Sequence, residues 1–238
     1  MKLMEEGSEV YLCVRRREGR LYPDALVRQL PDVPDDHPFR QEWRARAASA
    51  DRLADYLGRF RRPIRMLDVG CGNGWLDGRL AQAAPLSVVG LDRNRFELDQ
   101  ARRVFSGRGE LSWIEADVFR APFPDRSFDI ILIASAIQYF DDVAELIDAL
   151  RPLLATRGEI HILDSPFYPP EQLPAARERS RRYYSDLGFP DMAAHYHHHT
   201  PDVMEPFGPA CLYKPREARD LEPRVDSPFP WYRLRPDW

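Results

Sequence analysis

The sequence predicts an α/β fold, with a mostly parallel sheet covered by helices on both faces. Short apolar runs alternate with amphipathic stretches from residue 64 onward. Most of these runs are too continuously apolar to face water on one side, which is typical of buried parallel strands. The chain of 238 residues is also long enough to bury the core of one large domain.

The expected strands follow one another at short intervals. They are IRMLDV (64–69), LSVVGLD (86–92), LSWIEAD (111–117), FDIILIA (128–134) and EIHILD (159–164). Helical periodicity lies between and after them, at 75–84, 94–105, 141–151 and 171–187. Two further candidate strands near the C-terminus are ACLYKP (210–215) and FPWYRL (229–234). We therefore expect one domain over residues 63–238.

Residues 1–62 precede this pattern and are expected to form an N-terminal extension. Apolar and polar residues alternate from Val10 to Val14 ahead of an Arg-Glu-Gly turn, so residues 9–22 predict a short hairpin. The stretch FRQEWRARAASADRLADYL (39–57) carries apolar residues at helical spacing and is followed by Gly58, so it predicts a helix.

Composition argues against several classes of protein. A net charge of −4 is unlike that of a general binder of nucleic-acid phosphates. Cys13, Cys71 and Cys211 form neither the close ligand pairs of a structural zinc site nor an even disulfide framework. No apolar run approaches the roughly 20 residues that span a bilayer, and acids occupy the place of a signal peptide's apolar core. We expect a reduced, cytoplasmic protein without a membrane segment or a metal.

The strongest functional signal is the turn DVGCGNG (68–74), directly after the first strand. Ligands bind outside the carboxyl ends of parallel strands. Glycines there let the backbone approach a ligand closely, and the start of the next helix offers free N–H groups. A dinucleotide fingerprint would require Gly or Ala at position 75. The chain has Trp75, which weighs against NAD or FAD.

Acidic residues mark the ends of three successive strands. Asp68, Asp92 and Asp117 follow one another at spacings of 24 and 25 residues. Each of them alone could be a cap for the next helix or turn. Together they are expected to lie along one edge of the sheet, beside the glycine turn.

The order of these motifs resembles that of class I S-adenosylmethionine (SAM)-dependent methyltransferases, in particular the small-molecule group with the ubiquinone and menaquinone methyltransferases. The likeness covers about residues 64–165 and implies a Rossmann-like, doubly wound sheet. It implies that Asp92 binds the ribose hydroxyls, that Asp117 accepts from the adenine amino group, and that the Val118 backbone contacts the ring. The glycine turn and the loop after 128–134 would hold the methionine part.

The resemblance implies the following cofactor-binding residues: Asp68, Gly70, Cys71, Gly72, Gly74, Asp92, Arg93, Asp117, Val118, Ala134 and Ser135. It also implies that the helix with Trp43 covers the SAM cleft, with Tyr22 and Arg44 as candidate contacts.

The implied activity is methyl transfer from SAM to a small-molecule acceptor at oxygen, carbon or nitrogen. The D/N-P-P-Y/F loop of amino-group methyltransferases is absent, because ASAIQYF (134–140) follows the fourth strand. DSPFYPP (164–170) is expected to be a strand exit stiffened by prolines. Two alternatives stay open: an RNA methyltransferase with arginines from 177 to 182 in a groove, and a SAM-fold binding protein without turnover.

A substrate-lid insertion is expected at about residues 165–199, as in this family, and it ends in HYHHH (195–199). The following TPDVMEPFG (200–208) is expected to be the last helix, with its N-terminal end at the cleft. Three interpretations of the histidines remain: a polar turn, a general base supplied by His197, His198 or His199, or a metal site without an evident ligand set.

Overall fold

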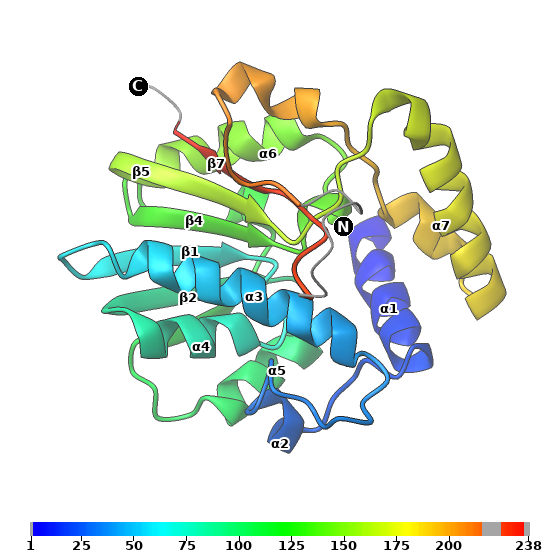
Figure 1. Ribbon diagram of the computed structural model, residues 1–238, viewed down its shortest axis with the longest axis horizontal. Coiled ribbons are helices and arrows are strands. Elements are labelled where there is room, and N and C mark those ends of the chain that lie inside the picture. The colour runs from blue at the N-terminus through cyan, green and yellow to red at the C-terminus, as the bar shows by residue number, and fades with distance from the viewer. Residues whose placement is uncertain (1, 216–224, 236–238) are drawn as a thin grey trace.

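The computed structural model describes residues 2–215 and 225–235 (Figure 1). Seven strands form one sheet in the order β3-β2-β1-β4-β5-β7-β6. They are β1 (Ile64–Val69), β2 (Leu86–Asp92), β3 (Leu111–Glu115), β4 (Phe128–Ala134), β5 (Leu154–Leu163), β6 (Ala210–Tyr213) and β7 (Trp231–Leu234). The first five are parallel, and β7 lies antiparallel between β5 and β6. The predicted mostly parallel α/β sheet is therefore confirmed.

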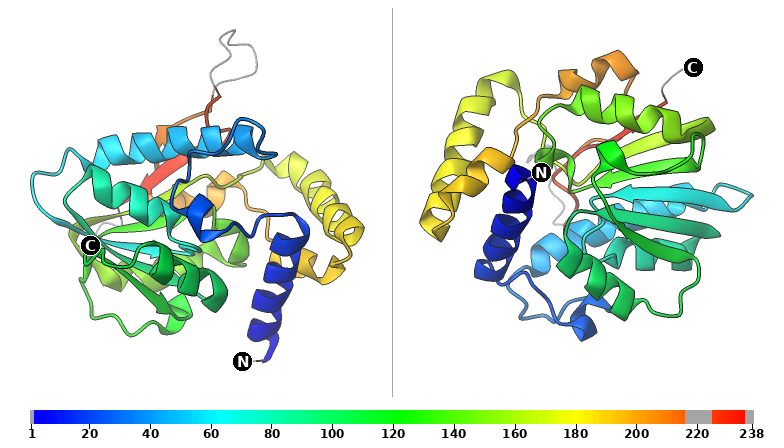
Figure 2. Two further views of the ribbon diagram at one scale, coloured as in Figure 1. Left: turned by 90° about the horizontal axis from the view of Figure 1, so that it is seen from below. Right: turned by 180° about the vertical axis from the view of Figure 1, so that it is seen from behind.

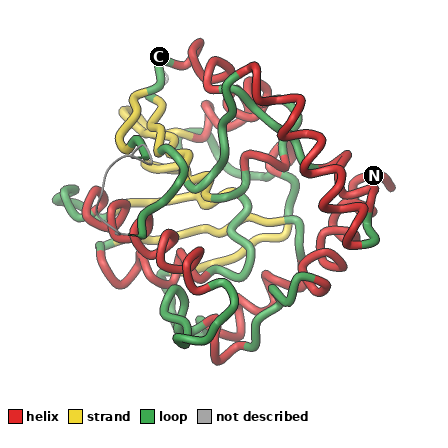
Figure 3. The backbone as a smooth tube through the Cα atoms, turned by 45° about the vertical axis from the view of Figure 1, so that its right-hand side comes forward, coloured by secondary structure: helices red, strands yellow, loops and turns green. Residues whose placement is uncertain are grey.

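Helices enclose this sheet (Figure 3). They are α1 (Lys2–Arg17), α2 (Asp24–Val27), α3 (Arg40–Leu57), α4 (Trp75–Ala83), α5 (Arg95–Val104), α6 (Val143–Leu150) and α7 (Leu173–Leu187). In the ranges that the structure describes, no helix is long and apolar enough to cross a bilayer.

The alternation of side chains along β1 explains why both faces are covered. Ile64 and Met66 pack into one core, which also contains residues of α3 and α4. Leu67 and Val69 point the other way, into a second core that contains residues of α6. Successive residues of a strand face opposite sides of the sheet, so a strand that is apolar throughout requires helices on both.

The predicted hairpin at residues 9–22 is wrong, because residues 2–17 form α1. Val10 and Val14 are four residues apart, so they also share one face of a helix. This face packs against Tyr184 of α7 and Met192. A run as short as 10–14 satisfies both periodicities, and packing against α7 decided between them (Figure 2).

The expected last helix at 200–208 is shorter and tighter than an α-helix. Residues Pro201–Phe207 form a 3-10 helix that buries Met204 and Phe207. Thr200 stands at its N-cap position but makes no side-chain cap hydrogen bond. Pro206 has no N–H to donate, which disfavours a regular α-helix here. The order of elements is nevertheless as predicted, since β6 follows directly.

Gly78 in α4 gives a first testable prediction about this fold. A Cβ at position 78 would lie 2.3 Å from Cε1 of Phe105, whose ring is buried. We expect Gly78→Ala to lower the free energy of unfolding by about 1–3 kcal/mol, because overpacking outweighs the gain in helix propensity. Urea denaturation measures this loss. Gly109→Ala is the matched control, because nothing lies within 4 Å of its added Cβ; equal stabilities of the two variants would contradict the prediction.

Candidate functional site

A cavity of about 1410 Å³ lies at the carboxyl ends of the parallel strands. Residues at the ends of β1 to β5 form its floor, and residues of α1, α3 and α7 form its walls. The strand arrowheads in Figure 1 point toward α1 and α7, which pack side by side beyond the edge of the sheet. This is the edge at which ligands bind in open parallel sheets.

The glycine turn after β1 forms part of the floor. Gly70, Gly72 and Gly74 all have positive φ angles, of 79°, 54° and 70°. A Cβ at position 70 would lie 2.7 Å from Cβ of Ala136 in the loop after β4, and one at position 74 would lie 2.9 Å from Nε1 of Trp113. The turn therefore requires glycine, both for its backbone conformation and for its neighbours. It leaves bare backbone facing the cavity at Gly70 and Gly72.

Asp92, at the end of β2, is hydrogen-bonded to this turn. Its Oδ2 accepts a hydrogen bond from the Gly72 N–H at 2.8 Å, and its Oδ1 accepts from the Asn94 N–H at 2.8 Å. Burial raises the pKa of Asp92, and these backbone N–H groups act in the opposite direction. The carboxylate thus links the ends of β1 and β2 while it lines the cavity.

Asp117 lies beyond the end of β3 and also caps the 3-10 helix Val118–Arg120. Its Oδ1 accepts from the Phe119 N–H at 3.2 Å. The capping role therefore exists, and Asp117 lines the cavity as well. Because β3, β2 and β1 are neighbours in the sheet, Asp117, Asp92 and the glycine turn follow one another along the floor.

The eleven residues predicted to bind a cofactor come together in this way, with one exception. All of them line the cavity except Gly74, which packs against Trp113 and Ala101. Carboxylates outnumber arginines among the lining side chains, so the cavity favours a ligand that carries positive charge. A cationic adenosyl ligand such as SAM fits both features.

Residues 67–162 match a family model described as a methyltransferase domain. This part of the chain is a methyltransferase domain. The Rossmann-like sheet that the sequence predicted is confirmed, and so is the resemblance to methyltransferases over these residues.

Two curated relatives share this domain. The chain is 36% identical over 126 residues to the demethylmenaquinone methyltransferase of Thermus thermophilus. This match covers 52% of this chain and 54% of the relative. It is 30% identical over 135 residues to the 27-O-demethylrifamycin SV methyltransferase of Amycolatopsis mediterranei. That match covers 55% of this chain and 49% of the relative. The chain therefore spans about half the length of each relative.

A solved structure extends the likeness of fold beyond the methyltransferase domain. The geranyl diphosphate C-methyltransferase from Streptomyces coelicolor A3(2) superposes with a TM-score of 0.64 at 13% identity. The match covers 86% of this chain and 83% of the other. At this identity the likeness concerns the fold alone.

The helix α3 closes one side of the methyltransferase domain's cavity, as expected for the helix with Trp43. Trp43 lines the cavity and donates from Nε1 to the hydroxyl of Tyr22 at 3.3 Å. Arg44, a predicted contact, is exposed and does not line the cavity; Arg46 does. The reason is helical geometry, because the lining positions 41, 42, 45 and 46 share one face of α3 and position 44 lies outside that face.

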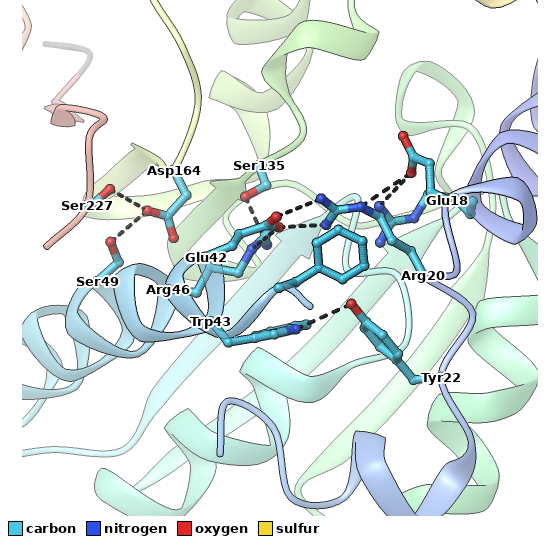
Figure 4. Close-up of polar contacts among 12 residues, drawn as sticks. Glu18, Arg20, Tyr22, Glu42, Trp43, Arg46, Ser49, Ser135, Asp164 and Ser227 are labelled. Atoms are coloured by element: carbon cyan, nitrogen blue, oxygen red, sulfur yellow. Dashed lines mark hydrogen bonds and ion pairs between the residues drawn. The ribbon is translucent and has the colours of Figure 1, made fainter. Parts of the chain in front are cut away.

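Arg46 belongs to a charged network above the end of β4 (Figure 4). Its Nη1 donates to Oγ of Ser135 at 3.2 Å, and its Nε donates to Glu42 at 3.1 Å. Arg20 donates to both oxygens of the same Glu42 carboxylate, at 2.8 and 2.7 Å. Glu42 is therefore balanced by two guanidinium groups.

An aromatic wall closes the side of the cavity beneath α1 and α7. It consists of Tyr11, Tyr139, Tyr184 and Tyr196, all of which line the cavity. Ring centroids lie 5.6 Å apart for Tyr11 and Tyr139, 6.0 Å for Tyr139 and Tyr196, and 5.9 Å for Tyr184 and Tyr196. Such packed rings offer a ligand apolar area and phenol hydroxyls at once.

The candidate bases His197, His198 and His199 do not line the cavity; His195 and Tyr196 do. His197 Nδ1 lies 3.1 Å from Oδ1 of Asp141, His198 Nε2 lies 3.0 Å from Oγ of Ser180, and His199 Nε2 lies 3.0 Å from the Phe140 carbonyl oxygen. Burial lowers the pKa of all three rings. The expectation that they border the cleft is thus wrong for these three residues, because their rings tie the segment to α7 and to the loop after β4.

The arginines from 177 to 182, which the RNA alternative placed in a groove, are mostly turned to solvent. Arg181 and Arg182 are exposed and pair with Glu178 at 3.0 and 2.8 Å. Of these arginines, Arg179 lines the cavity.

Two buried acids of the site escaped the sequence analysis. Asp77, in the first turn of α4, lies beneath Asp68, and burial raises the pKa of Asp77 to about 7. Burial and the neighbouring Asp77 carboxyl raise the pKa of Asp68 well above its usual range, so this pair does not carry two full charges at neutral pH. Glu97 in α5 lines the cavity, and burial, with Asp92 nearby, raises its pKa to about 7.

A signal for Glu97 existed in the sequence. Position 97 precedes Ala101 by four residues and Val104 by seven, so the helical period places it on the buried stripe of α5. For Asp77 we find no comparable signal, since an acid in the first turn of a helix is common at exposed positions as well.

Proposed function

We propose that this protein transfers a methyl group from SAM to a small-molecule acceptor bound in the same cavity. One observation carries the proposal: a glycine turn, Asp92 and Asp117 stand side by side along the floor of one cavity, at the ends of three neighbouring strands of a methyltransferase domain. SAM would supply an activated methyl group on a sulfonium cation.

The residues of the floor have distinct roles in this proposal. Asp92 would bind the ribose hydroxyls, and Asp117 with the Val118 backbone would bind adenine. The bare backbone at Gly70 and Gly72, together with Ser135, would hold the methionine part. The excess of carboxylates and the aromatic wall would favour the sulfonium cation. Methyl transfer depends mainly on alignment of the acceptor with the methyl group, which the walls and floor of this cavity would provide.

The walls of the cavity are a further argument for a small acceptor. The helices α1 and α7 and the 3-10 helix Pro190–His195 pack on one another and leave the cavity beneath them. We propose that residues 165–199 form the substrate lid and that α1 and α3 complete it. A cytoplasmic location remains part of the proposal; Cys13, Cys71 and Cys211 are all free thiols.

Thermal unfolding with ligands tests the cofactor. At about 100 times its Kd, SAM should add about 2.7 kcal/mol to stability, which corresponds to a rise in Tm of about 5–10 °C. S-adenosylhomocysteine should also raise Tm, and NAD should not, because Trp75 replaces the small residue of a dinucleotide turn. A rise with NAD, or none with SAM, would contradict the proposal. SAM binding without transfer to any acceptor would favour a binding protein.

A further inference from the structure

The end of β5 is the part of the floor that the proposed SAM residues leave free. Ser135 follows β4 and Asp164 follows β5, and both line the cavity. Both have left-handed backbones, with φ angles of 54° and 52°. Left-handed residues other than glycine are uncommon and are concentrated at functional sites. The left-handed backbone of Asp164, at the end of a strand, therefore indicates a functional position.

Two hydroxyl groups from distant parts of the chain hold Asp164. Ser49 of α3 donates to Oδ1 at 2.6 Å, and Ser227 donates to the same oxygen at 2.9 Å. Figure 4 shows both serines on one carboxylate oxygen, with the second oxygen turned away from them. That second oxygen accepts no hydrogen bond from the part of the chain that the structure describes. The Asp164 side chain is partly exposed, and it lines the cavity.

Asp164 differs from the other carboxylates at this end of the cavity. Glu42 is paired with Arg20 and Arg46, and Asp226 is paired with Arg52 at 2.7 Å. Within residues 2–215 and 225–235, Asp164 makes no ion pair. A carboxylate bound only by hydroxyls is a stronger base than one neutralised by guanidinium groups. Burial raises the pKa of Asp164, against the hydrogen bonds of the two serines and the charges of Arg46 and Arg52, neither of which pairs with it directly.

Asp164 also lies where an acceptor would stand. In the sheet order, β1 with the glycine turn is followed by β4 and then by β5. Position 70 is in close contact with Ala136 after β4, and Arg46 above Ser135 is near enough to act on the charge of Asp164. Moving along the floor from the proposed cofactor residues, the next carboxylate at a strand end is Asp164.

We propose that Asp164 is the catalytic base, and that the acceptor is a molecule with an ionisable O–H or acidic C–H group. This inference rests on the proposed function. The second carboxylate oxygen takes the proton from the acceptor while the acceptor atom forms its bond to the methyl carbon. The carbon–sulfur bond breaks, its electron pair stays on sulfur, and S-adenosylhomocysteine leaves neutral. The protonated Asp164 returns its proton to water. Ser49 and Ser227 are positioning residues that fix the carboxylate.

The test combines SAM affinity with methyl transfer from radiolabelled SAM to named probes. The probes are 2-naphthol and 1,3-cyclohexanedione, which carry an acidic proton, and quinoline, whose ring nitrogen carries none. We expect the wild type to methylate at least one acidic probe. Asp164→Asn should lower that rate at least about 100-fold, the usual contribution of a general base, and change the SAM Kd less than about threefold. Asp51→Asn, on the exposed side of α3 where Asp51 pairs with Arg79, is the matched control and should leave both unchanged.

A second variant separates catalysis from a structural role. Ser227→Ala removes one donor that stabilises the charged carboxylate, so it raises the pKa of Asp164. The acidic limb of the pH–rate profile should therefore move to higher pH in Ser227→Ala and disappear in Asp164→Asn. A structural role alone would leave the position of the limb unchanged.

The possible failures are distinguishable. Wild type that does not bind SAM would overturn the proposed function itself. Wild type that binds SAM but methylates only quinoline, or neither acidic probe, would overturn the acceptor class. A wild-type rate in Asp164→Asn, or an unmoved acidic limb in Ser227→Ala, would overturn the role of Asp164.

Discussion

Replacement of Asp92 by alanine should weaken SAM binding by at least about 100-fold. Two effects add in this variant. The proposed hydrogen bonds to the ribose are lost, and hydrogen bonds to a charged group contribute about 1.5–3 kcal/mol each. The Gly72 and Asn94 N–H groups also lose their shared acceptor, so the glycine turn is no longer fastened to β2. A loss of about 3 kcal/mol corresponds to somewhat more than 100-fold in Kd.

Isothermal titration with SAM and with S-adenosylhomocysteine measures this effect. The ribose is the same in both compounds, so Asp92→Ala should weaken both by similar factors. Asp99→Ala is the matched control, because Asp99 lies on the exposed side of α5, pairs with Arg102 and does not line the cavity. A Kd for Asp92→Ala within about threefold of the wild-type value would remove Asp92 from the cofactor site.

Replacement of Glu159 by alanine should lower the free energy of unfolding by about 3–5 kcal/mol, the usual cost of removing one partner of a buried charged pair. Glu159 of β5 is 3% exposed. Its carboxylate accepts from the Tyr56 hydroxyl at 2.6 Å, from Nε of Arg235 at 2.7 Å and from Nε2 of His161 at 3.1 Å. It thus joins α3, β5 and the end of β7.

The neighbouring His161 is completely buried, and its protonation follows from its partners. Trp231 of β7 donates from Nε1 to Nδ1 of His161 at 3.0 Å. Nδ1 is therefore an acceptor, so the proton lies on Nε2 and is donated to Glu159. Burial lowers the pKa of His161, so the ring stays neutral. In Glu159→Ala this buried N–H and the Tyr56 hydroxyl lose their acceptor, which adds to the loss.

The pH dependence of stability provides a second measurement on this cluster. The surrounding donors lower the pKa of Glu159 from 4.5 to about 2, against the effect of burial. The unfolded state therefore binds protons first as pH falls. The stabilisation is complete above about pH 4.5 and is lost between about pH 4.5 and 2, with a magnitude of about 3 kcal/mol. The lowered pKa of His161 acts in the same direction, since acid charges this ring more readily in the unfolded chain.

Chemical denaturation between pH 2 and pH 7 compares the two proteins. The wild type should lose stability steeply below pH 4.5, and Glu159→Ala should show a shallower acid limb from a lower plateau. Asp148→Ala is the matched control, because Asp148 is exposed and faces Arg151 at 3.8 Å; it should cost less than about 1 kcal/mol. Equal losses in Glu159→Ala and Asp148→Ala would mean that the buried cluster does not stabilise the fold.

Local patterns in the sequence were sufficient to predict the residues that form the floor of the cavity. Strands β1, β2 and β4 have the predicted bounds, because a buried parallel strand is a continuous apolar run with a clear end. Once these strands were assigned, parallel order alone placed Asp92 and Asp117 at one edge. The same rule would have included Asp164, which also follows a buried strand, but the prolines after it suggested only a strand exit.

The walls were much harder to predict. Residues 9–22 satisfied the period of a strand and of a helix. The histidines at 197–199 directly precede the 3-10 helix Pro201–Phe207, as expected, but their rings do not face the cavity. In both cases the outcome depended on packing against α7 and the loop after β4, which no local pattern encodes.

The sequence by itself determined the parallel sheet, the glycine turn and the row of acids at its edge, because strand period and chain direction are local properties. Only the tertiary structure decided which side chains surround Asp164, the proposed base. Ser49 and Ser227 reach Asp164 across 115 and 63 residues of chain. Contacts at such separations arise from the packing of α3 and the C-terminal segment on β5, so they appear only when the whole fold is assembled.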